Sequence, residues 1–86
     1  MRSAKTILII EMDKRRATAT DAQDIMTEHG CIIKTRLGIH DGVLDKCSDM
    51  GIIILELVGA KKERLDLEKK LKALPGVKTR SVNFPL

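Results

Sequence analysis

The stretch from His40 to Met50 (HDGVLDKCSDM) holds the densest group of side chains that could do chemistry in this chain. His40 and Cys47 offer the nitrogen and sulfur ligands that nickel, zinc or iron accepts. Oxygen ligands come from three aspartates: Asp41, Asp45 and Asp49. The spacing matches no zinc motif, and Asp, Gly and Ser are also common turn formers. The stretch is therefore either a solvated hairpin loop or a metal site completed between two chains.

Basic residues in two other segments could bind an anion. Lys34, Arg36, Lys78 and Arg80 fall on segments that we expect to be edge strands, where they could form one basic sheet surface. Charges at sheet edges also prevent pairing with other chains, so both interpretations stay open. His29 falls at the expected C-terminus of a helix, where an imidazole is favourable as a capping or surface residue.

The sequence contains none of the patterns that mark an enzyme. It has no glycine-rich phosphate loop, no paired carboxylates in a pocket-forming context and no Ser/His/Asp set with an interpretable spacing. We therefore expect a protein without catalytic activity. The absence of Trp and Tyr argues against binding of single-stranded nucleic acid, which usually needs aromatic stacking. We expect no direct contact with nucleic acid.

The composition is typical of one small soluble domain that covers residues 1–86. The net charge of +4, from 16 basic and 12 acidic residues, is spread along the chain and fits a solvated surface. Cys31 and Cys47 form neither a disulfide framework nor a CxxC motif, and the N-terminus does not have the pattern of a signal peptide. We expect a cytoplasmic protein with reduced thiols and no membrane association.

Four segments have the character of strands, and they fall into two kinds. Lys5–Met12 (KTILIIEM) and Gly51–Val58 (GIIILELV) are apolar on both alternating faces, which predicts central strands. The second run is too short to cross a bilayer. Cys31–Ile39 (CIIKTRLGI) and Val77–Phe84 (VKTRSVNF) alternate, which predicts edge strands. In the segment Cys31–Ile39 we expect one apolar face, which holds Cys31, Ile33, Thr35, Leu37 and Ile39. Cys31 would be a small core residue.

Two segments have helical periodicity, at about residues 15–29 and 61–73. The apolar stripe of the first holds Thr18, Ala22, Ile25, Met26 and His29, and that of the second holds Arg64, Leu67, Leu71 and Leu74. Gly30 suits the left-handed position after a helix, and Pro75-Gly76 ends the second helix. Asp66 and Lys70 form a favourable pair four residues apart.

The order β-α-β-β-α-β predicts a ferredoxin-like α+β sandwich with two helices on one face of a four-stranded antiparallel sheet. In that arrangement the first and third strands are central, as their apolar character requires. The face without helices would then expose the apolar residues of the central strands to water. A monomer seldom exposes so large a patch, so we expect a homo-oligomer, a dimer or a tetramer, that buries this open face.

The spacing of several residues along this pattern resembles a known family. Arg36-Leu37-Gly38 ends the second strand, Gly51-Ile52-Ile53 with Leu57 and Gly59 marks the third, and Leu71 and Pro75-Gly76-Val77 precede the fourth. Over about residues 5–84 the chain resembles the small ACT-like, ferredoxin-fold proteins regarded as regulators of the iron-only hydrogenase system. More distantly it is similar to ACT amino-acid-sensing domains and to the C-terminal domain of nickel-responsive repressors. Asp13 is the acidic residue after the first strand, but Lys14-Arg15-Arg16 follow it in place of the turn usual in ACT domains.

The resemblance implies a small, non-enzymatic, homo-oligomeric regulatory or ligand-sensing domain. A ligand would bind at a subunit interface near the strand ends and the 40–50 stretch, and our candidate binding residues are Asp13, Arg36, His40 and Asp41. One alternative is a sensor of nickel, zinc or iron that uses His40 and Cys47 across an interface. Another is a protein–protein interaction module without a small ligand. The sequence identifies no cofactor.

Overall fold

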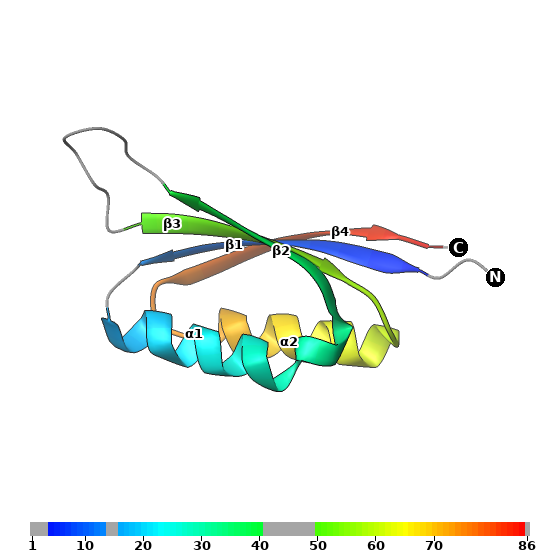
Figure 1. The fold of residues 1–86 in the computed structure, drawn as a ribbon, viewed down its shortest axis with the longest axis horizontal. Coiled ribbons are helices and arrows are strands. Elements are labelled where there is room, and N and C mark those ends of the chain that lie inside the picture. The colour runs from blue at the N-terminus through cyan, green and yellow to red at the C-terminus, as the bar shows by residue number, and fades with distance from the viewer. Residues whose placement is uncertain (1–3, 14–15, 41–49, 86) are drawn as a thin grey trace.

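The computed structural model describes residues 4–13, 16–40 and 50–85. Along the chain these form β1 (Lys5–Asp13), α1 (Arg16–Glu28), the 3-10 helix η1 (Gly30–Ile32), β2 (Ile33–His40), β3 (Met50–Leu57), α2 (Lys61–Lys72) and β4 (Val77–Phe84). The strands make one antiparallel sheet in the order β2-β3-β1-β4. Both helices lie against the same face of this sheet, and no described element covers the other (Figure 1). None of the described helices is long and apolar enough to cross a membrane.

The ferredoxin-like α+β fold predicted from the order of elements is confirmed. β1 and β3 occupy the centre and β2 and β4 the edges, as the apolar pattern predicts. A central strand must bury both rows of side chains more deeply than an edge strand, so only a sequence that is apolar at consecutive positions fits there. The apolar pattern of the strands therefore agrees with their order in the sheet.

The core lies between the sheet and the two helices. Its fully buried side chains are Leu8 and Ile10 from β1, Leu55 and Leu57 from β3, Ala22 from α1, and Leu67 and Leu71 from α2. The stripes predicted for both helices are therefore the faces that pack on the sheet. Each fully buried Leu or Ile contributes about 1.5–3 kcal/mol relative to an exposed position. Because these side chains occupy the face of the sheet that packs on the helices, the alternate residues of each strand lie on the face without helices.

The beginning of β2 differs from the sequence expectation. The chain leaves α1 through His29 into η1, and β2 starts only at Ile33. Gly30 does not adopt a left-handed conformation, and Cys31 is exposed in η1, so the predictions of a left-handed Gly30 and a core Cys31 were wrong. The 3-10 turn directs Ile32 into the core in place of Cys31.

A register irregularity between Ile33 and Thr35 also breaks the expected alternation. Ile33 pairs with Leu57, which faces the helices, whereas Leu37 pairs with Ile54, which does not. One extra residue moves the rest of a strand to the opposite face. The apolar row of β2 is consequently split, and Thr35, Leu37 and Ile39 lie on the face without helices.

Two glycines bound the second helix. Gly59 and Gly76 have φ values of 90° and 75°, a region that favours glycine because it lacks a Cβ. Gly59 turns the chain from β3 into α2, where an added Cβ would lie 3.0 Å from Ile32 Cγ2. Val58 also donates its backbone N–H to the Ile32 carbonyl at 2.8 Å. These contacts fix the start of α2 against η1.

Candidate functional site

The open face of the sheet is the surface opposite the helices, and the strand register gives its composition. Its apolar members come from all four strands and are Ile7, Ile9, Leu37, Ile39, Ile52, Ile54, Val82 and Phe84. Rows of cross-strand neighbours result, such as Ile9, Ile54 and Leu37 side by side on β1, β3 and β2. Side chains directly opposite on paired strands are in contact. The open face is therefore a continuous apolar surface.

The exposure of this surface is unusual for a monomer. Among the described residues five large hydrophobic side chains are exposed, and four of them belong to the open face: Leu37, Ile39, Val82 and Phe84, at 41–53%. The fifth, Leu65, lies on α2. Soluble monomers rarely expose a contiguous apolar patch larger than a few hundred Å². The open face therefore has the character of a contact surface.

A polar group lies across the open face toward the beginning of β1. Lys5 Nζ donates to Glu56 Oε2 at 2.8 Å, and Thr35 Oγ1 donates to Glu56 Oε1 at 3.0 Å. These two hydrogen bonds, first that from Lys5 and then that from Thr35, hold the pKa of the Glu56 carboxyl below its usual value. The group links β1, β3 and β2 through the Glu56 carboxylate.

The β4 side of the open face carries positive charge. Lys78 pairs with Glu11 of β1, and Arg80 lies opposite Ile9 on the same face. The open face thus has an apolar centre, with cations along its β4 edge and the Glu56 carboxylate toward the end of the sheet. Such an arrangement can specify the orientation of a partner through charge.

The structure separates the four basic residues predicted to form one surface. β2 and β4 are opposite edges of the sheet, and Arg36 pairs with Leu55 on the side of the helices, while Lys78 and Arg80 lie on the open face. Of the two interpretations of Lys34, Arg36, Lys78 and Arg80, the single basic sheet surface is therefore wrong. The bulge near Ile33 is one cause, because it sets the face on which Arg36 lies.

Two of the sequence-predicted binding residues end strands that flank β3, at the same end of the sheet. Asp13 is the last residue of β1 and pairs with Met50, and His40 is the last residue of β2 and pairs with Gly51. The backbone thus brings both positions to the start of β3. Asp41 and Cys47 lie outside the described residues, so the ligand role of Asp41 and the metal role of His40 and Cys47 stay predictions.

Arg36 is the predicted binding residue whose side chain is described. It is exposed, and its Nη2 donates to Gln23 Oε1 of α1 at 2.6 Å. It also borders a cavity of about 340 Å³ with Met12, Gly38 and Ile53. A cavity of this size with one cationic wall can hold a small anionic ligand.

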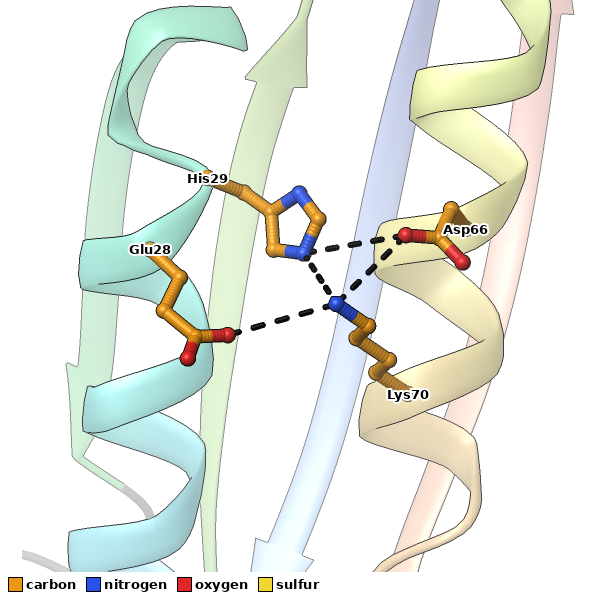
Figure 2. Close-up of polar contacts among 4 residues, drawn as sticks. All are labelled: Glu28, His29, Asp66 and Lys70. Carbon is orange, nitrogen blue, oxygen red and sulfur yellow. Dashed lines mark hydrogen bonds and ion pairs between the residues drawn. The ribbon is translucent and has the colours of Figure 1, made fainter.

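A polar cluster connects the C-terminal end of α1 with the middle turns of α2 (Figure 2). Lys70 Nζ of α2 lies 3.2 Å from His29 Nε2, 3.5 Å from Asp66 Oδ2 and 4.0 Å from Glu28 Oε2. The predicted pair of Asp66 and Lys70 is confirmed, and His29 is packed between the helices with its side chain only 16% exposed. Within the described residues no group of three or more His, Cys, Asp or Glu side chains could hold a metal ion. The contacts of Lys70 with His29 and Glu28 link α2 to the end of α1.

Sequence reasoning missed two groups that the fold assembles. The first is the group of Lys5, Thr35 and Glu56, for which the only sequence signal was a carboxylate that interrupts an apolar strand. The second is the hydrogen bond from Arg64 to the Gly59 carbonyl; the sequence places Arg64 on the apolar stripe of α2 but does not give this contact. The partners of Glu56 lie far apart in sequence and meet through the strand register, whereas Arg64 and Gly59 are five residues apart and meet at the start of α2.

Comparison with known proteins adds support for the fold. No family model and no curated protein sequence matches the chain. Among solved structures, uncharacterized protein TM1266 from Thermotoga maritima superposes with a TM-score of 0.83 at 23% identity, covering 96% of this chain and 99% of that one. The C-terminal domain of the MgtC protein from Mycobacterium tuberculosis gives a TM-score of 0.68 at 11% identity, covering 95% and 88%.

A third similar structure is CPII, a nitrogen regulatory PII-like protein from Thiomonas intermedia, bound to ADP, AMP and bicarbonate. It gives a TM-score of 0.58 at 15% identity over 96% of this chain and 92% of that one. At these identities the similarity concerns the arrangement of strands and helices. The chain thus shares its ferredoxin-like α+β fold with proteins of this kind.

Proposed function

We propose that the chain is a small, non-enzymatic regulatory domain that works as a homo-oligomer. The observation that carries the proposal is the open face, where four strands present a continuous apolar surface. An identical copy is the simplest partner, because a two-fold axis places the same apolar centre on both sides of the interface. The occurrence of the fold in a nitrogen regulatory PII-like protein supports a regulatory role.

The mechanism that we propose is a shift in population between arrangements of the subunits. A ligand that binds near the ends of β1 and β2 would stabilise one arrangement, and a partner protein would recognise it. Asp13, Arg36, His40 and Asp41 are the residues proposed to bind it. The support is that Asp13 and His40 flank the start of β3 and that Arg36 borders a cavity beside them. The proposed connection to the iron-only hydrogenase system rests on the sequence resemblance.

Light scattering coupled to gel filtration tests the oligomer. We expect the wild-type chain to elute with at least twice its 9.6 kDa mass. Ile54→Lys, at the centre of the open face, should reduce the mass to that of one chain. Leu65→Lys is the control, because Leu65 is an exposed apolar residue on α2, outside the open face. A wild-type mass of one chain, or equal effects of both substitutions, would contradict the proposal.

A thermal-shift screen against amino acids, nucleotides and divalent metal ions tests the ligand. A ligand at about 100 times its dissociation constant should stabilise the folded state by about 2.7 kcal/mol. A shift with one amino acid or nucleotide that is lost in Arg36→Ala would support the proposed site. No shift with any compound in the screen would contradict ligand sensing and favour a protein–protein interaction module.

The second candidate is a metal sensor that uses His40 and Cys47 between subunits. It is favoured by the position of Asp13 and His40, which end β1 and β2 on either side of the start of β3. Metal analysis of protein purified without a histidine tag should find nickel, zinc or iron. Metal content that is unchanged in the His40→Ala, Cys47→Ala double variant would exclude this site.

A further inference from the structure

Arg64 is a buried charge that the described residues do not neutralise. Its side chain is 8% exposed and lies on the face of α2 that also buries Leu67 and Leu71. Its Nη1 donates to the Gly59 carbonyl at 3.2 Å, while its Nε is buried without a hydrogen-bond partner. No carboxylate among the described residues forms an ion pair with it. Burial of an unpaired charge is costly, so an anion at the part of the guanidinium that borders a cavity would stabilise it.

Arg64 borders a cavity of about 460 Å³ at the beginning of α2. The other walls come from Lys5 of β1, Asn83 and Phe84 at the end of β4, and Gly59 and Lys61. Lys5 and Phe84 are paired in the sheet, so the two strand ends and the helix start enclose one space. A cavity of this volume is in the range that holds small molecules. It lies at the opposite end of the sheet from Asp13 and His40.

The helix end that faces this cavity lacks a cap. Ala60 is the N-cap of α2 and makes no side-chain hydrogen bond to the first turn. The first N–H groups of a helix have no partner within it and carry the positive end of the helix dipole. Lys61 adds a cation at this position, where a basic side chain opposes the dipole. Glu63 supplies one carboxylate in the first turn, and an anion in the cavity would satisfy the remaining N–H groups and offset the charges of Arg64 and Lys61.

The remaining walls indicate what else the ligand carries. Thr6 Oγ1 donates to Asn83 Oδ1 at 2.7 Å, which leaves the Asn83 amide N–H₂ as a donor. Phe84 is 51% exposed and presents an apolar wall beside these polar groups. Two cations, an amide donor and a helix N-terminus match a doubly charged phosphate better than a singly charged carboxylate.

We propose that this cavity binds a small phosphate-bearing molecule. The phosphate would lie between Arg64, Lys61 and the N-terminus of α2, and an apolar or aromatic portion would lie against Phe84. The phosphate-binding groups Arg64 and Lys61 belong to α2 and lie at the opposite end of the sheet from Arg36, whereas Lys5 and Phe84 are shared with the open face.

Calorimetric titration of the full chain with phenyl phosphate tests this proposal. We expect one phenyl phosphate to bind per chain. It should bind more tightly than inorganic phosphate, because its ring contacts Phe84. It should also bind more tightly than benzoate, because the phosphate carries a second negative charge. Lys61→Ala should weaken binding about tenfold, as expected for loss of one charge-assisted hydrogen bond. Lys62→Ala is the matched control, since Lys62 is exposed on the same turn but does not line the cavity.

Arg64→Met gives a readout that a purely structural role would not produce. Methionine keeps an apolar stem on the buried face and removes the charge, so binding should be lost while the melting temperature is unchanged or raised. Absence of phenyl phosphate binding at millimolar concentration, or equal effects of Lys61→Ala and Lys62→Ala, would overturn the proposal. Tighter binding of benzoate than of phenyl phosphate would overturn the assignment of a phosphate.

Discussion

Ile54 and Leu55 are neighbours in β3 whose side chains lie on opposite faces of the sheet, so truncating each of them tests the two faces separately. Leu55 is fully buried against the helices. Leu→Ala at such a site costs about 2.7–5 kcal/mol, because both apolar burial and packing are lost. For a domain of this size 1 kcal/mol corresponds to about 4–8 °C in melting temperature. We therefore expect Leu55→Ala to lower the melting temperature by at least about 11 °C.

Ile54→Ala should behave differently. Ile54 is half-buried on the open face, so within one chain the loss of three carbon atoms should cost about 1 kcal/mol. Its larger effect should appear on association, since the residue would lie at the centre of the interface between copies. The stability deficit of Ile54→Ala should grow as the protein concentration rises, whereas that of Leu55→Ala should be constant.

Urea unfolding of the wild type and both variants, each at low and high micromolar concentration, measures these deficits. Two results would refute the reasoning. The first is a deficit for Ile54→Ala that equals that of Leu55→Ala at low concentration, because the open face would then be packed within the chain. The second is a deficit for Leu55→Ala below about 1 kcal/mol, which is incompatible with a fully buried leucine.

Three further predictions concern individual contacts. The pKa of the Glu56 carboxyl is lowered in the folded state, so the wild type should be more stable than Glu56→Gln by a constant amount at any pH above the ordinary carboxyl pKa of 4.5. This difference in the free energy of unfolding should shrink as the pH falls below 4.5. A difference that grows in acid would contradict the lowered pKa. Gly59→Ala should lower the free energy of unfolding in urea by at least about 1 kcal/mol, because Gly59 has a positive φ and an added Cβ would approach Ile32 closely. Gly30→Ala should have no such effect, because the space around Gly30 is open. Equal effects of the two substitutions would argue against the turn geometry at Gly59. Lys70→Ala should change stability by less than about 1 kcal/mol, because its ion pairs are exposed; a larger loss would show that the link between the helices is a core contact.

The fold could be predicted because its signals are local. Lys5–Met12 and Gly51–Val58 are apolar at consecutive positions, and such segments fit only at the centre of a sheet. The apolar stripes of the helices gave the buried faces, including the unusual position of Arg64. The lengths of the apolar segments, the order of strands and helices along the chain and the periodicity of the apolar residues were therefore sufficient to predict the strand order β2-β3-β1-β4.

The details of the surfaces could not be predicted because they depend on register. The irregularity between Ile33 and Thr35 has no sequence signal of its own, yet it decides that Leu37 faces away from the helices and Arg36 toward them. The hydrogen bonds of Glu56 with Lys5 and Thr35 join residues 51 and 21 positions apart. Contacts of this kind follow from pairing that a local pattern does not encode.

Sedimentation equilibrium of the wild-type chain tests the central claim, that the open face is an interface between copies. We predict a mass that is a multiple of 9.6 kDa at micromolar concentration and that falls toward the mass of one chain on dilution, with Ile54→Lys at the mass of one chain throughout. A wild-type mass of one chain at every concentration would contradict the account, because the apolar surface formed by Ile9, Ile54 and Leu37 would then be stable in water without a partner copy.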